Sequence, residues 1–446
     1  MSGNVEGIMP PKFVRITSTC LTIAALAMLG GRAVAQDTLT LDQALHLASE
    51  RNGTIKAAFY NVRSAHAFVD QLRAAFYPSV TASYGYNRDR SLTQTSLGDS
   101  IINTDGSSTN ISASWRLLDL GEREYSLLSG RRSEDATKNE TLETLRETLF
   151  AVHQQFYDAL RSQELQKVAE KQVERTQKIY DQTEFGARPE IGAFPKKDVL
   201  QANADLLNSK VDLLKAKNTT ATNLAILKGT IGWDPKSDLP TLSAPSAPTE
   251  FPAPPPRDQV IADGLRDRPD LRAQRQRMEA QKFSAQLADR QAGLSLGLDV
   301  NFSHNFSPNQ NDDRNLSLLV TYPVFDGGRL RAIARQEHFT LDSDKALLVQ
   351  SERSAQSQIE SAYTDLVQNG ERVTAAKLAL DAAQQNYDAA VAAQSEGVND
   401  IIAVLTAQVS LVTAESNYIE ATYDYYESDV NLKLVTGKPI PGENIK

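Results

Sequence analysis

Residues suited to acid–base, nucleophilic or metal chemistry are few in this chain and lie far apart. None of its five histidines has a partner at metal-ligand spacing, and no nucleophile elbow or phosphate-binding loop is present. The one cysteine, Cys20, precedes the segment that we expect to fold, and Met278 is the only methionine within that segment, so a thioether path for copper is not expected. We therefore predict no enzyme activity, no cofactor and no metal. The histidines are His46, His66, His153, His304 and His338.

Two phrases with the same spacing stand out instead, WRLLDLGER from Trp115 and YPVFDGGRL from Tyr322. In each phrase an aromatic residue is followed four positions later by aspartate, with glycine two positions further on. Aspartate at a helix start accepts hydrogen bonds from backbone N–H groups that lack a partner in the helix, and glycine permits a sharp bend. Each phrase is therefore predicted to join a strand to a helix. The junction residues are Asp119, Gly121, Asp326 and Gly328.

The first 35 residues are typical of an export signal. Lys12 and Arg15 precede a mostly apolar run, 21–30, and residues 33–35 form a small-x-small cleavage site. A membrane anchor is the alternative, but this run is too short for a bilayer core, which needs about 20 residues. Cleavage would leave 44 basic and 55 acidic residues, a net charge of −11, which argues against nucleic acid as a partner. No later run of apolar residues is long enough to predict a membrane-spanning helix.

The junction phrases belong to a plan that the chain repeats. The helical stretch that ends at Arg73 recurs 217 residues later at Arg290, and the junction phrase recurs after 207 residues. DVLQA, which begins at Asp198, recurs after 205 residues as AVLTA. Because the offset falls by ten between the first two landmarks, we expect a longer loop in the first copy, at the polar residues 88–100.

We accordingly divide the chain into a signal peptide, two repeats, a linker and a tail. The linker contains eight of the 18 prolines, which favours an extended surface segment over a helix or a central strand. The bounds are 1–35 for the signal peptide, 36–233 for the first repeat, 234–258 for the linker, 259–438 for the second repeat and 439–446 for a periplasmic C-terminal tail. Each repeat is expected to contain a helix, a strand hairpin (79–118 or 294–325), a long helix (122–185 or 328–394) and a further helix (196–229 or 399–435).

Apolar residues at steps of three and four predict that the long helices pack side by side, as in a coiled coil. A helix from Glu122 to Asp181 would be roughly 90 Å long, which exceeds the span of a single globular domain. Each long helix is followed by a turn that contains glycine, Gly192 or Gly397, and then by an antiparallel partner helix. The helices alone favour a soluble stalk.

The segments before the junction phrases alternate apolar and polar residues over nine to eleven positions, which predicts strands with one apolar face. Four strands are too few for the alternative, a soluble β-sandwich, and their length matches strands that cross a membrane. Open sheet edges are excluded from lipid, and about eight strands are the minimum for a closed barrel. Several copies must therefore complete one barrel, with Trp115 and Tyr322 in the aromatic belt at the membrane interface.

The junction phrases, the glycine turns followed by DVLQA and AVLTA, and the duplicated layout make the chain resemble the TolC family of outer-membrane efflux and secretion channels over 37–438. The resemblance implies a mainly α fold with a small β part and two internal repeats. It implies a homotrimer in the outer membrane of a Gram-negative bacterium, where four strands per chain form a shared 12-stranded transmembrane β-barrel. Long antiparallel helices continue this barrel through the periplasm as an α-barrel tunnel. The implied partners are outer-membrane lipid, a periplasmic adaptor (membrane fusion) protein and an inner-membrane pump of the RND, ABC or MFS type, which alone supplies the energy.

The resemblance also implies a periplasmic entrance at the turns that contain Gly192 and Gly397. Asp198 matches an acidic residue that takes part in the closed gate of the family. The residue that matches its partner here is Asn399, which cannot form a salt bridge.

A second part of the family's gate is absent from this sequence. Ala403 and Thr406 stand where some members carry a ring of acidic residues at the constriction, and Asp400 is the nearby residue that could substitute. We therefore hypothesise a gate held by hydrogen bonds, looser and less cation-selective than a gate with stacked carboxylate rings.

The predicted function is that of the outer-membrane channel in a tripartite efflux or type I secretion system. Small molecules such as drugs and toxic compounds, or polypeptides, would leave through it passively. The alternative is an exported trimeric coiled-coil stalk or adhesin whose strands serve only as an anchor. The duplicated hairpin and the lack of a large passenger domain argue against that alternative.

Overall fold

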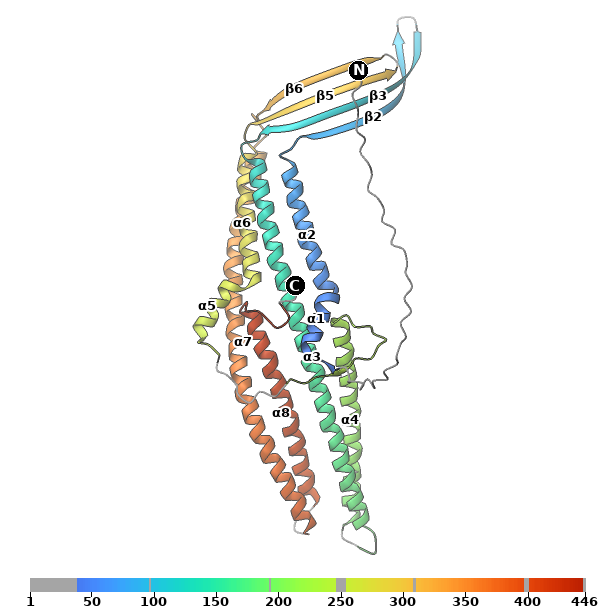
Figure 1. Ribbon diagram of the computed structural model, residues 1–446, viewed down its shortest axis with the longest axis vertical. Helices are drawn as coiled ribbons and strands as arrows, with labels where there is room; N and C mark the ends of the chain where they lie inside the picture. Colours follow the sequence, from blue (N-terminus) through green and yellow to red (C-terminus); the bar gives the residue numbers. More distant parts are fainter. Residues whose placement is uncertain are drawn as a thin grey trace, which may run out of the picture. The chain divides into compact units, whose positions relative to one another are not determined.

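Each half of the chain folds as two helices, a β-hairpin, a long helix and a last helix that runs back along it (Figure 1). The computed structural model describes residues 38–95, 98–191, 194–245, 254–307, 310–396 and 401–443. All of them fall in one unit of the chain, Thr38–Lys446. The predicted signal peptide falls in the other unit, Met1–Asp37, outside the described residues.

Corresponding elements of the two halves appear in the same order. The first half contains α1 (Leu41–Arg51), α2 (Gly53–Ala74), β2 (Ser79–Thr95), β3 (Gly98–Leu118), α3 (Glu122–Gly186) and α4 (Lys196–Thr230). The second half contains α5 (Arg257–Asp267), α6 (Pro269–Arg290), β5 (Ser295–Ser307), β6 (Asn311–Thr321), α7 (Arg329–Ser395) and α8 (Ile401–Val435). Two further strands, β1 (Thr38–Leu39) and β4 (Thr241–Leu242), pair in parallel.

The segments that lead into the sheet correspond with an offset of 216 residues, not the predicted 217. Both α1 and α2 begin 216 residues before α5 and α6, and each pair has equal length, 11 and 22 residues. Asn52, whose side chain caps α2, therefore corresponds to Arg268, and the predicted match of Arg73 with Arg290 is wrong by one position. The bounds and caps of the helices show which residues of the two halves correspond. The arginines near the ends of α2 and α6 are exposed, so an arginine can occupy either of two neighbouring positions there and does not mark equivalent residues.

The polar stretch 88–100 is not the predicted loop. β2 continues to Thr95 and β3 begins at Gly98, so the first hairpin has strands of 17 and 21 residues, against 13 and 11 in the second. Arg88 lies directly opposite Asp105, and their side chains form an ion pair at 3.3 Å. Cross-strand pairs of opposite charge support a ladder even where neither face is apolar. The additional residues of the first copy therefore lengthen its strands.

The four long strands form one antiparallel sheet in the order β2-β3-β5-β6, and the contact of β3 with β5 joins the two halves. The register collects the alternating apolar residues of all four strands on one face and their polar neighbours on the other. One apolar row consists of Val80, Ala113, Val300 and Leu316, and the adjacent polar row of Ser79, Ser114, Asp299 and Ser317. The apolar face is exposed on the two edge strands, β2 and β6, where Val80 and Leu316 are 69% and 72% accessible.

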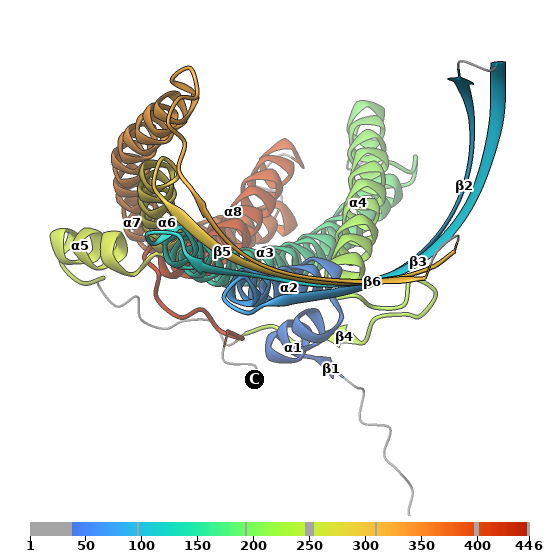
Figure 2. The same ribbon diagram turned by 90° about the horizontal axis from the view of Figure 1, so that it is seen from above.

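The long helices α3 and α7 have 65 and 67 residues, so each is roughly 100 Å long. α3 contacts α2, α4, α6 and α8, whereas α7 contacts α5, α6 and α8. Figure 2 shows α4 and α8 on either side of α3. Buried residues of α1, α3, α4 and α8 form one hydrophobic core, which includes Leu45, Leu149, Phe156 and Leu227.

The linker and the predicted tail are partly built into this core. Leu242 of β4 and Ile440 beyond α8 are buried against it, with 6% and 3% of their surface exposed. The helix α5 begins at Arg257, inside the predicted linker, and residues 246–253 lie outside the described part of the chain. The linker is thus anchored by a short strand at one end and a helix at the other.

The segment after α8 is clasped to α3 by a buried arginine. Arg146, of which 1% is exposed, donates hydrogen bonds to the carbonyls of Lys433 (3.1 Å) and Lys438. Its Nε also lies 3.4 Å from the carboxylate of Glu443. The residues predicted as a tail, 439–446, therefore pack on the helices as far as they are described.

Candidate functional site

The first strand-to-helix junction is tied together by Asp119 and Arg123. The carboxylate of Asp119 is 3% exposed and accepts hydrogen bonds from the backbone N–H of Gly121 (3.3 Å) and from Nε of Arg123 (2.6 Å). The guanidinium of Arg123 also donates to the carbonyl of Arg116 (2.7 Å) and lies over the ring of Phe76 (5.0 Å). One network therefore holds the end of β3, the start of α3 and the turn between α2 and β2.

Both junctions turn through left-handed backbone conformations. The φ angles are 52° at Leu120 and 99° at Gly121 in the first junction, and 69° at Gly327 and 88° at Gly328 in the second. Glycine adopts these angles without strain, whereas a leucine there brings its Cβ close to the backbone. Leu120 is the only non-glycine residue with a positive φ in the described part of the chain.

The second junction is organised by the side chain of Asp326 and two backbone N–H groups. The half-buried carboxylate of Asp326 accepts hydrogen bonds from the N–H groups of Gly328 (2.9 Å) and Leu330 (2.7 Å). These two donors hold the pKa of Asp326 below its usual value. The residues just before it, Val324 and Phe325, are 88% and 91% exposed. This junction therefore presents an apolar surface that the chain itself leaves uncovered.

The two junction aromatics differ in their surroundings. Trp115 lies in β3 and donates its indole N–H to the carbonyl of Phe76 (3.0 Å). Tyr322 is 60% exposed and lies beyond the end of β6 at Thr321, whereas the predicted hairpin continued to 325. Pro323 explains the early end, because proline has no N–H to donate to the ladder. A place at the membrane interface remains a prediction for both aromatics.

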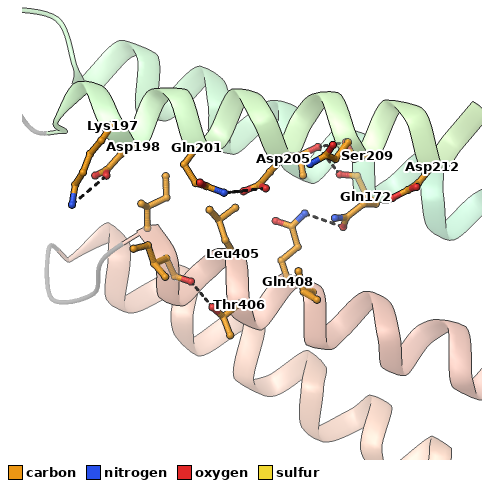
Figure 3. A pocket seen from close by; sticks show the side chains of 15 residues that line it. Gln172, Lys197, Asp198, Gln201, Asp205, Ser209, Asp212, Leu405, Thr406 and Gln408 are labelled. Carbon is orange, nitrogen blue, oxygen red and sulfur yellow. Dashed lines mark hydrogen bonds and ion pairs between the residues drawn. The ribbon is translucent and has the colours of Figure 1, made fainter.

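A groove of about 610 Å³ lies between α4 and α8, with residues of α3 between them (Figure 3). Three carboxylates from α4, Asp198, Asp205 and Asp212, line it at intervals of seven residues, which places them on one face of that helix. From α8, the side-chain amide of Gln408 donates to the side-chain oxygen of Gln172 on α3 (2.9 Å). The groove is therefore rich in carboxylates and amides, and it starts at the first turns of α4 and α8.

Asp198 lies in the first turn of α4 with 7% of its surface exposed, and its carboxylate is 4.0 Å from Nζ of Lys197. Thr406, where some TolC-like sequences carry an acidic residue, lines the same groove from α8. The pairing of Asp198 with its predicted partner stays a prediction. The entrance residues that lie outside the described part of the chain are Gly192, Gly397, Asn399 and Asp400.

Sequence reasoning missed the ion pairs that join α3 to α8. Arg175 donates to both carboxylate oxygens of Glu415, at 2.8 and 3.1 Å. Arg161 donates to Glu427 (2.7 Å) and lies 3.0 Å from a carboxylate oxygen of Asp424. Burial raises the pKa of Glu427 to about 7, although Arg161 opposes the shift. The partners are 240 and 266 residues apart in sequence, so no local signal could have paired them.

Neither a metal centre nor a helical membrane span is found in the described residues. No group of three or more His, Cys, Asp or Glu side chains there is arranged to hold a metal ion. The helices of this part of the chain also lack the combination of length and apolar character that a bilayer crossing requires.

Comparison with known proteins gives consistent matches over most of the chain. The family described as "Outer membrane efflux protein" matches residues 44–232 and 260–438. Protein CyaE of Bordetella pertussis is 27% identical over 344 residues, which cover 74% of this chain and 69% of that protein. Outer membrane protein TolC of Vibrio cholerae is 24% identical over 417 residues, which cover 89% and 87%. The solved structure of the outer-membrane channel OprN superposes with a TM-score of 0.77 at 19% identity and covers 90% of each chain.

Proposed function

Because the chain belongs to the outer membrane efflux protein family, and is thus the outer-membrane channel of an export system, we propose that three copies form one conduit. Their strands close a barrel in the outer membrane, and their long helices continue it as a tunnel through the periplasm. Small molecules or polypeptides pass through it without energy from the channel itself.

The observation that carries this proposal is the unfinished sheet. It has an apolar face and a polar face, and among the described strands β2 and β6 each pair on one side only. Unpaired backbone groups cannot remain in lipid, because each costs several kcal/mol there (roughly 2–7). Closing the sheet with other copies removes both edges and turns the apolar face to lipid and the polar face to the pore.

The width of the conduit favours three copies. Each chain supplies four strands, so two copies would give eight and three would give 12. An interior of about eight strands is filled by its own side chains, whereas a larger barrel leaves an open lumen. A trimer is therefore the smallest assembly whose barrel leaves an open lumen for cargo.

The helices also present uncovered apolar edges. On α4 the residues Leu200, Leu207 and Leu214 are 61%, 54% and 68% exposed, at intervals of seven. On α7, at the other edge of the helical layer, Leu347 and Leu378 are 53% and 67% exposed. The row on α4 is typical of a helix that packs against a neighbour, and the exposed leucines of α7 offer apolar surface to it. Contact between α4 of one copy and α7 of the next would cover both.

We place the entrance gate at the α3–α4 and α7–α8 turns, with Asp198 buried beside it. The acidic groove between α4 and α8 lies next to these turns and is accessible to a periplasmic adaptor protein, and the energy comes from an inner-membrane pump of the RND, ABC or MFS type. A crosslinker applied in intact cells, followed by purification, should recover both partners. Recovery of neither would contradict the tripartite assembly.

Ion conductance distinguishes this function from that of a stalk or adhesin with a barrel anchor. Protein purified in detergent and added to a planar lipid bilayer should produce discrete conductance steps. A stalk would leave the current at baseline. Asp400→Ala tests the gate hypothesis separately: a change in cation selectivity is expected, and unchanged selectivity would remove Asp400 from the gate.

A further inference from the structure

We infer that the neighbouring copy docks in one definite register, with Thr321 of β6 directly opposite Ser83 of β2 in the neighbouring copy. This inference rests on the proposed trimer and specifies its interface. It follows from the contact between the two halves of one chain, in which Ser114 of β3 lies opposite Asp299 of β5. The internal contact is the template, because a closed ring of repeats alternates contacts within and between chains.

The two hairpins correspond residue for residue, which makes the template usable. Ser79 lies opposite Ser114 in the first hairpin, and Ser295 lies opposite Thr321 in the second. Adding 216 to a residue number in β2 gives the equivalent residue of β5, and adding 207 to a residue number in β3 gives the equivalent residue of β6. The same offsets relate α2 to α6 and α3 to α7. At the interface between copies, β6 therefore takes the place of β3, and β2 of the neighbouring copy takes the place of β5.

The proposed register places a glycine of the neighbouring copy next to Leu319, a large residue on the polar face of the sheet. Leu319 is 59% exposed and lies opposite Gly297 within the chain. The internal pair Ser112–Asn301 converts to Leu319 and Gly85 of the neighbouring copy. Leu319 would thus have glycine on both sides, in a face where serine, threonine, asparagine and aspartate predominate and where Arg116 lies beyond Gly297. A register shifted by two residues would set it beside Ser83 or Asn87 of the neighbouring copy instead.

A second exchange of large and small residues occurs at the junctions. Inside the chain, Leu120 packs so closely on Gly293 that a Cβ on this glycine would lie 2.8 Å from Cδ1 of the leucine. The same offsets convert Leu120 to Gly327 and Gly293 to Tyr77 of the neighbouring copy. A Cβ on Gly327 meets nothing within 4 Å, and Tyr77 is 69% exposed. Inside the chain the large residue is Leu120 and the small one is Gly293, whereas between copies the large residue is Tyr77 and the small one is Gly327. The contact between copies therefore stays complementary in volume.

The helices repeat this conversion. Within the chain, Ser129 of α3 lies 2.9 Å from Ser284 of α6, a small polar contact. The equivalent residues are Gln336 of α7 and Phe68 of the neighbouring copy, which is 49% exposed. Gln336 lines a hollow of about 560 Å³ on α7, beside the 70% exposed Phe339. The exposed ring and the hollow fit the same docking that the strands require.

Disulfide trapping tests the register cleanly, because the only cysteine of the chain, Cys20, lies in the predicted signal peptide. In full-length protein, Thr321→Cys with Ser83→Cys should give covalent trimers on a non-reducing gel. Thr321→Cys with Thr81→Cys, and Ser317→Cys with Asp89→Cys, are matched controls for shifts of two residues in either direction. Residues offset by two lie about 7–8 Å apart, beyond the usual reach of a disulfide. We expect at least about tenfold more covalent product for the first pair.

Three other outcomes would overturn the inference. More product from either control pair would show a shifted register. Trimers that resist cross-linking at all three pairs would show that β6 and β2 of the neighbouring copy do not pair. Protein that is monomeric before oxidation would overturn the trimer as well, which separates failure of the proposed function from failure of the register alone. Each single-cysteine variant reports the background.

Discussion

Replacing Glu415 by glutamine should loosen the contact between α3 and α8 near the entrance. Arg175 donates to both carboxylate oxygens, and the two side chains are only 19% and 14% exposed. Glutamine keeps the size and one acceptor oxygen of glutamate but removes its charge. The guanidinium then keeps its position 5.7 Å from the ring of Tyr387 but loses its anionic partner.

The expected magnitude follows from the geometry of the pair. An exposed ion pair contributes about 0.2–1 kcal/mol, and a hydrogen bond to a charged group about 1.5–3 kcal/mol. The Arg175–Glu415 pair is bidentate and largely shielded from water, so we expect a coupling free energy of about 2 kcal/mol. Glu174, next in sequence to Arg175, pairs with Lys178 on the open surface of α3 and provides a matched control. Its replacement by glutamine should have no measurable effect.

A double-mutant cycle measures this coupling. The free energy of unfolding in urea is determined for the wild type, Arg175→Met, Glu415→Gln and the double variant, with Glu174→Gln beside them. If the pair also restrains the entrance, Glu415→Gln should raise the open-channel current in a bilayer. A coupling free energy below about 0.5 kcal/mol, or an equal loss from Glu174→Gln, would refute the reasoning.

Three further changes test other parts of the structure. Arg146→Ala should lower the free energy of unfolding by about 3–5 kcal/mol, because two carbonyls lose their buried donor and Glu443 loses its cationic partner, and trypsin should then cleave more readily after Lys433; Arg146→Lys should lose less. Glu427 has a folded-state pKa of about 7, above its unfolded value of about 4.3, so stability should fall as the pH rises between these values. Glu427→Gln should flatten that fall in melting temperature between pH 5 and 8, and an unchanged slope would contradict the assignment. Gly328→Ala, at φ 88°, should cost about 1–2 kcal/mol in urea unfolding, whereas Gly53→Ala, at the start of α2, should not destabilise the protein.

The mainly helical fold and the family could be predicted from the sequence because the spacing of apolar residues can be read from a single chain. Steps of three and four in the long helices, and steps of two in the strands, are local signals. Leu149, Val152 and Phe156, which suggested the first long helix, are each fully buried in the core. The junction phrases, the glycine turns and the duplicated layout together indicated the outer-membrane channel class, and the family comparison confirms it.

What the sequence could not provide depends on contacts between distant residues. The strands around Arg88 and Asp105 form a ladder because the two residues lie opposite each other, whereas their polar composition alone predicted a loop. The burial of Asp198 and the Arg175–Glu415 pair arise where α4 and α8 pack on α3, which local spacing does not encode. The helix bounds also corrected the offset of the repeat by one residue, and the proposed docking register depends on that correction.

The claim that one chain supplies too little sheet to seal itself in lipid is tested most directly by counting chains. Native mass spectrometry of the detergent-extracted protein, released from its micelles, gives the number of copies without any assumption about shape. The account predicts a single species of three chains. A stable, folded monomer as the dominant species would contradict it.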